Sequence, residues 1–156
     1  MPTIERLDLT IHDNASDLWR LQHAAYRIEA KLIGVPDLPP LHDTTASLQA
    51  SEETFWGYRD GDGELIGAIA AEIAKDGSGV ISRMMVHPDH FRQGIAGALI
   101  SHMMHAWDQV AVWEVTAEAR NLPAIALYER YGFEAVDTFH PREDITMITM
   151  KLRAKT

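Results

Sequence analysis

Apolar residues in the first third of the chain recur every three or four positions, which is the spacing of one helix face. They are Leu18, Leu21, Ala25, Ile28 and Leu32. Asn14 precedes them as a good N-cap, with Asp17 three residues later as the partner of a capping box. Gly34 and the following prolines end the pattern. The sequence predicts a helix from Asn14 to about residue 33, a loop, and a short helix over 44–50.

Alternation of apolar and polar residues predicts strands on both sides of these helices. The expected strands cover 3–9, 54–58, 64–73, 80–86, 111–117, 133–139 and 144–152. The segment Asp60-Gly61-Asp62-Gly63 is a hairpin signal between two of them. Helical spacing returns over 94–110, and again after Pro123 until Gly132. The order βααβββαβαββ indicates an α+β fold with a mixed sheet rather than a regular βαβα repeat.

Length and composition are those of one ordinary domain spanning residues 1–156. Apolar residues make up 46% of the chain and charged residues 24%. The absence of cysteine excludes disulfides, thiolate metal sites and a cysteine nucleophile. The N-terminus lacks the apolar core of a signal peptide, and the longest apolar stretch, 65–71, is too short to span a bilayer. We therefore expect a cytoplasmic protein that does not enter membranes.

The net charge of −9 disfavours nucleic acid and anionic membranes as partners and favours cationic ones. An equal alternative is that the acidity only maintains solubility. Two histidine pairs, His87 with His90 and His102 with His105, have a spacing compatible with metal ligation. No third ligand accompanies either pair, so we predict no metal site.

The segment 80–100 carries the clearest chemical signal. A β-branched strand ends at His87-Pro88, and six residues after Pro88 comes Gly94, which opens a small-residue turn and a helix. This arrangement places unpaired backbone N–H groups at the positive end of a helix dipole. The small side chains allow a ligand to approach the backbone closely. The segment therefore predicts a site for a phosphate or pyrophosphate.

Two motifs resemble those of the GNAT superfamily of acyl-CoA N-acyltransferases. Residues 86–88 and 91–99, Val-His-Pro and Phe-Arg-Gln-Gly-Ile-Ala-Gly-Ala-Leu, resemble its cofactor-binding motif. Residues 121–133 match its second motif, N-x-x-A-x-x-L-Y-x-x-x-G-F. The resemblance implies a mixed, mostly antiparallel seven-stranded sheet flanked by about four helices, with strands four and five splayed. Acetyl-CoA would lie in that split, with its pantetheine paired to strand four.

The resemblance also assigns roles to individual residues. Pyrophosphate would be held by the backbone amides of Arg92, Gln93, Gly94, Ile95, Ala96 and Gly97. Met85 and Val86 would pair with pantetheine, and an N–H near Val86 would polarise the thioester carbonyl. Asn121 would hydrogen-bond the pantetheine arm, in addition to its natural place as a helix cap. Tyr128 would protonate the departing thiolate, although its position on an apolar helix face also fits a residue of the hydrophobic core.

One position departs from the family pattern: Phe91 stands where the family prefers Gln or Arg. The neighbouring Arg92 can compensate, and most contacts to phosphate there come from the backbone, so we expect binding to persist.

The sequence does not single out one residue as the general base. An amine must be neutral to attack, so a base is expected. Strand alternation places Glu114, Thr116 and Glu118 on one face around strand five, and Glu72 lies on strand three. Some relatives carry a glutamate on strand five, but the matching position here is Thr116. The candidates are therefore Glu114, Glu118 and Glu72, each with the alternative of being an ordinary solvated side chain.

The expected activity is transfer of acetyl from acetyl-CoA to a primary amine by direct attack in a ternary complex. The acceptor would be a cationic small molecule, such as a polyamine or an aminoglycoside-like amine, or a peptide N-terminus. Its expected wall residues are Tyr26, Glu29, Leu38, His42 and Trp56. A homodimer is left open.

Two alternatives to this enzyme remain. One is a non-catalytic acyl-CoA-binding sensor or partner domain. The other is an unrelated nucleotide-binding domain, although the Rossmann and P-loop fingerprints are both missing.

Overall fold

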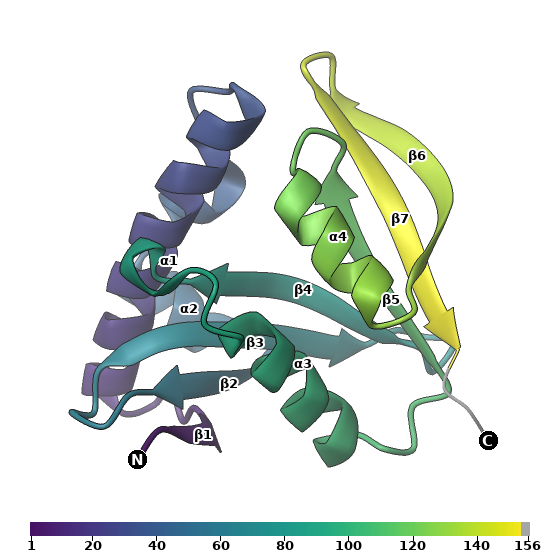
Figure 1. Ribbon diagram of the computed structural model, residues 1–156. Helices are drawn as coiled ribbons and strands as arrows, with labels where there is room; N and C mark the ends of the chain where they lie inside the picture. Colours follow the sequence, from purple (N-terminus) through teal and green to yellow (C-terminus); the bar gives the residue numbers. More distant parts are fainter. Residues whose placement is uncertain (154–156) are drawn as a thin grey trace.

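A computed structural model describes residues 1–153, which form one seven-stranded sheet with helices on both faces (Figure 1). The strand order is β1-β2-β3-β4-β5-β7-β6. The strands are β1 Thr3–Arg6, β2 Thr54–Arg59, β3 Leu65–Ile73, β4 Gly79–Val86, β5 Val112–Glu118, β6 Glu134–Arg142 and β7 Ile145–Arg153. The α-helices are α1 His12–Ile33, α2 Thr45–Ala50, α3 Ile95–Ala106 and α4 Leu122–Arg130. Two 3₁₀ turns, η1 Pro39–His42 and η2 Pro88–His90, complete the description.

The sheet separates two cores because alternate residues of its central strands point to opposite faces. On β3, Ala68 and Ala70 pack in a cluster with leucines of α1 and α2. Ile69 and Ala71 instead join a cluster that includes the buried side chains of α3. Helices α1 and α2 therefore cover one face, and α3 covers the other.

The central strands β4 and β5 are parallel but pair only at their beginnings. Their register covers Gly79 with Trp113, Val80 with Glu114 and Ile81 with Val115. Beyond Ile81 the two strands diverge, and they lie far apart at their carboxyl ends (Figure 1). The expected α+β fold with splayed fourth and fifth strands is thus confirmed.

A β-bulge marks the point where the split opens. The β3–β4 register passes from Ala70 opposite Arg83 to Ala71 opposite Ile81, which leaves Ser82 as the extra residue. A bulge bends its strand and increases the local twist. The bulge therefore accompanies the turn of β4 away from β5.

Several expected boundaries were wrong. Helix α1 begins at His12 with Ile11 as its N-cap, so Asn14 lies inside the helix. The Asn14 side chain donates to the carbonyl of Asp8 and accepts from Arg59, and these tertiary contacts replace the cap. Asp17 likewise binds Arg59 instead of closing a capping box.

A capping box does occur, but at α2, where Thr44 and Ser47 exchange hydrogen bonds. The first strand ends at Arg6 rather than Leu9, and α3 ends at Ala106 rather than Val110. At the end of α3, the ring of Trp107 stacks on Trp113 at a centroid separation of 6.2 Å. No helix within residues 1–153 is long and apolar enough to cross a membrane.

Candidate active site

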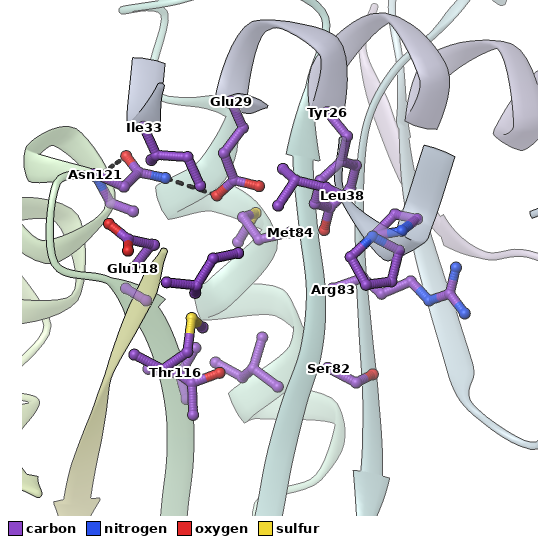
Figure 2. A pocket seen from close by; sticks show the side chains of 18 of the residues that line it. Tyr26, Glu29, Ile33, Leu38, Ser82, Arg83, Met84, Thr116, Glu118 and Asn121 are labelled. Carbon is purple, nitrogen blue, oxygen red and sulfur yellow. Dashed lines mark hydrogen bonds between the residues drawn. The ribbon is translucent and has the colours of Figure 1, made fainter. Parts of the chain in front are cut away.

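A pocket of about 410 Å³ occupies the split between β4 and β5. Its walls come from α1 and η1 on one side, from β4, β5 and α4 around the split, and from β6 and β7 (Figure 2). The end of α1 and the following loop reach β7, because Ile33, Val35 and Leu38 form a buried cluster with Ile145. The pocket is therefore lined by segments that are far apart in the sequence.

A turn with left-handed backbone leads into the N-terminus of α3, where the sequence predicts a site for pyrophosphate. Gly94 is its N-cap with a φ of 76°, and Arg92 before it has a φ of 64°. The Ala98 amide donates to the carbonyl of Gly94, so the amides of residues 95–97 precede the first bond of the helix. The Gly97 backbone lies against Tyr131, and a Cβ at this position would collide with the tyrosine hydroxyl.

The other residues of this loop lie around those amides. Phe91 is 48% exposed. Gln93 contacts the ring of His90 on η2. Ile95 is buried in the core beneath α3, and Ala96 lies in the first turn of the helix. Ile95 thus anchors the loop to the core.

The edge of β4 that faces the split is open. Residues 83–86 pair with β3 on one side, whereas β5 pairs with β4 only over 79–81 within the described chain. The Met85 side chain is buried in the α1-side core, and Val86 is half-buried. The Met85 and Val86 backbone therefore lies on an edge that an extended ligand can join as an additional strand.

Asn121 links α4 to α1. Its side-chain oxygen accepts from the Ala124 amide at 3.3 Å, so it caps α4 as expected. Its nitrogen donates to the Glu29 carboxylate at 2.7 Å (Figure 2). Because each end of the amide has a partner, the Asn121 side chain is held in one orientation at the pocket wall.

Tyr128 lines the pocket from α4 and is 3% exposed. Its ring packs edge-on against Phe133 at 5.7 Å between centroids. Burial raises the pKa of Tyr128, and interactions with Tyr26 and Glu29 raise it further. The pKa of Tyr26 is also raised, first by its burial. Both phenols are therefore protonated at neutral pH.

Glu29 extends from α1 into the space between the splayed strands (Figure 2). Burial raises the pKa of its carboxyl, the hydrogen bond from Asn121 opposes that rise, and the charge of Glu118 adds to it. The sequence placed Glu29 in the acceptor wall but did not mark it as a base. The available signal was its helical spacing from Tyr26 and Ile33, which also line the pocket.

Glu118 also lines the pocket, but its oxygens are fully engaged. They accept from the Arg120 amide at 2.8 Å, the Arg120 guanidinium at 3.0 Å and the Thr146 amide at 2.8 Å. The Arg120 side chain is the main cause that lowers the pKa of Glu118 to about 2. A carboxylate with so low a pKa is a weak base at neutral pH.

The other two candidate bases lie outside the pocket wall. Glu114 forms an ion pair with Lys151 of β7 at 3.8 Å. Glu72 is exposed near the end of β3. Thr116, the position expected to match the glutamate of some relatives, does line the pocket.

Three of the five expected acceptor-wall residues line the pocket: Tyr26, Glu29 and Leu38. His42 does not line it, and its exposed ring pairs with Asp37. Trp56 does not line it either, because it is buried in the α3-side core at 3% exposure. The described residues contain no group of three potential metal ligands.

A family model of the acetyltransferase (GNAT) domain matches residues 51–135, more than half of the chain. The chain belongs to the GNAT acetyltransferase family. This GNAT chain is also 36% identical over 142 residues to the protein UPF0157 protein YqkA of Bacillus subtilis (strain 168). The match covers 90% of this chain but only 40% of that relative's length.

Solved structures share the GNAT fold over nearly all of the chain. One is the ribosomal-protein-S18-alanine N-acetyltransferase from Escherichia coli, with a TM-score of 0.76, 22% identity, and coverage of 98% of this chain and 94% of that one. Another is the PaiA N-acetyltransferase from Thermoplasma acidophilum in complex with coenzyme A. It has a TM-score of 0.79, 14% identity, and coverage of 99% of both chains. At these identities the similarity establishes the fold.

Proposed function

We propose that this protein transfers an acetyl group from acetyl-CoA to a primary amine. The observation that carries the proposal is the pocket in the β4–β5 split, which joins an open edge of β4 to a set of titratable side chains. Family membership supports acyl-CoA as the donor, and the Thermoplasma acidophilum relative was solved with coenzyme A.

The cofactor would bind mainly through backbone groups. The amides of residues 92–97 suit the pyrophosphate because they lie at the N-terminus of α3. The open edge of β4 at Met85 and Val86 suits the amide groups of pantetheine. The Asn121 side chain lines the split and would contact the same arm. The thioester would then enter the pocket beside Tyr128.

The chemistry would be direct attack by the neutral amine on the thioester carbonyl. The chain has no cysteine, so acetyl transfer through an enzyme thioester is excluded. A backbone N–H near Val86 would stabilise the oxyanion. Tyr128 would give its proton to the leaving sulfur. The desolvation that raises the pKa of Tyr128 would also raise the pKa of a thiol in the same pocket, which keeps this transfer feasible.

A binding and turnover experiment tests the proposal. We expect calorimetry to detect binding of acetyl-CoA but not of NAD or ATP, and we expect amines to stimulate release of CoA thiol. Substitution Tyr128→Phe should lower kcat about 100-fold, in the range for general acids, and change the Kd of acetyl-CoA less than threefold. Tyr58→Phe on β2 is the matched control. Binding without turnover on a broad amine panel would instead indicate a non-catalytic acyl-CoA-binding domain.

A further inference from the structure

The charged side chains that line the pocket differ in how they are neutralised. Arg83 binds Asp43 at 2.7 Å and Glu53 at 2.9 Å. Its guanidinium points away from the pocket centre (Figure 2).

Two more charged groups of the wall are paired as well. Glu118 binds Arg120 at 3.0 Å, and Arg142 binds Asp144 at 3.1 Å. Glu29 is the exception: within residues 1–153 its hydrogen bond goes to the neutral amide of Asn121, and no arginine, lysine or histidine pairs with it. The pocket therefore contains one carboxylate without a counter-ion.

Most of the side chains that line the pocket around Glu29 are apolar. Ile33, Leu38 and Pro39 line it from α1 and the following turn, and Phe139, Ile145 and Met147 line it from β6 and β7. A second cationic group placed among these side chains would lose its hydration and gain no partner, which costs several kcal/mol. This side of the pocket therefore suits one ammonium group and an apolar substituent.

We propose that the acceptor is a primary monoamine carried by an apolar group, and that Glu29 receives its ammonium and removes the proton. This inference rests on the proposed acetyl transfer and specifies its acceptor. It replaces the polyamine or aminoglycoside-like acceptor expected from net charge, because among the described residues that line the pocket only one carboxylate, Glu29, has no counter-ion.

The proton transfers balance. One ammonium proton passes to Glu29, and the freed nitrogen lone pair forms the C–N bond to the acetyl carbon. The C–S bond breaks, and the sulfur leaves with the proton of Tyr128. The proton lost from the new amide nitrogen restores the Tyr128 hydroxyl, and Glu29 releases its proton to solvent.

The surroundings of Glu29 favour this role. Burial raises its pKa, which makes it a stronger base than an exposed carboxylate, and Asn121 orients it. The other ionisable groups around it are Glu118 on β5, Tyr128 on α4 and Tyr26 on α1. The pKa of Glu118 is about 2, and the pKa values of the two phenols are raised above their usual range. We therefore assign the loss of rate at acidic pH to protonation of Glu29.

The test compares pentylamine with 1,5-diaminopentane, which differ by one terminal ammonium, as substrates of the intact protein. We expect kcat/KM to be at least about tenfold higher for pentylamine, the effect of one poorly solvated charge. Glu29→Gln should lower kcat/KM about 100-fold, remove the acidic limb of the pH profile, and leave the Kd of acetyl-CoA within threefold. Glu134→Gln, at an exposed position at the start of β6, is the control and should change neither.

A second variant tests the wall independently of the base. Phe139 is 44% exposed at the pocket rim, so Phe139→Glu is expected to fold normally and to add a second carboxylate. In this variant the ratio of kcat/KM for 1,5-diaminopentane to kcat/KM for pentylamine should be about tenfold higher than in the wild type. Preference of the wild type for the diamine, or unchanged turnover in Glu29→Gln, would overturn the inference but keep acetyl transfer. Acetylation of no amine at all would overturn both.

Discussion

Substituting Glu118 with glutamine separates a structural carboxylate from a catalytic one. The carboxylate joins the end of β5 to β7, because it accepts hydrogen bonds from Arg120 and from the Thr146 amide. Its pKa is about 2 in the folded protein, against an ordinary value of 4.5. That difference corresponds to about 3.4 kcal/mol of stability at neutral pH.

Solvent reduces this figure because the side chain of Arg120 is 47% exposed. We therefore expect Glu118→Gln to lower the free energy of unfolding at pH 7 by about 1–2 kcal/mol. The carboxylate stabilises the fold above pH 4.5, and this contribution is lost as the pH falls towards 2. By pH 3 about 40% of the contribution remains, so the difference between wild type and variant should shrink accordingly.

Urea denaturation followed by tryptophan fluorescence at pH 7 and pH 3 measures both values. The matched control is Glu114→Gln on the same strand, whose exposed pair with Lys151 should be worth less than about 0.5 kcal/mol at either pH. A variant as stable as wild type at pH 7, or a loss of stability that is equal at both pH values, would refute the structural role. A normal stability with abolished turnover would restore Glu118 as a candidate base.

Three further predictions follow from the same contacts. Glu53→Gln should destabilise the fold by about 2–3 kcal/mol in urea titrations, because it leaves the partly buried Arg83 with one carboxylate fewer. An effect below about 0.5 kcal/mol would show that Asp43 alone is enough to neutralise Arg83. Gly94→Ala should lower the free energy of unfolding by about 1 kcal/mol and weaken acetyl-CoA binding in calorimetry, since the φ of 76° is unfavourable for alanine. An unchanged Kd would argue against the α3 amides as the pyrophosphate site. Phe91→Gln should change the Kd of acetyl-CoA less than threefold, because backbone amides dominate the predicted contacts; a tenfold gain would reveal a side-chain contribution that Phe91 lacks.

The parts of the site that the sequence predicted are local in the chain. The turn before α3 and the cap at Asn121 are defined by residues within a few positions of each other, so their spacing in the sequence carries the structural information. Through their resemblance to the GNAT superfamily, the same two motifs also predicted the splayed strands β4 and β5. These features define the side of the pocket assigned to the cofactor.

The remaining parts depend on residues far apart in sequence. Glu29 meets Asn121 across 92 positions, and Arg83 meets Asp43 across 40, which no periodicity can reveal. Asn14 failed as a cap because its side chain is used by Asp8 and Arg59 in the folded chain. Strand alternation placed Glu118 on a plausible face, but it could not show that Arg120 and Thr146 occupy its oxygens.

The most direct test of the central claim is amine-dependent release of CoA from acetyl-CoA by the purified protein, with the amine product analysed by mass spectrometry. We predict saturable release of CoA thiol that requires a primary amine and yields one acetylated amine for each thiol. Tight binding of acetyl-CoA with no acetylated product, or CoA release that is independent of any amine, would contradict acetyl transfer in the β4–β5 pocket.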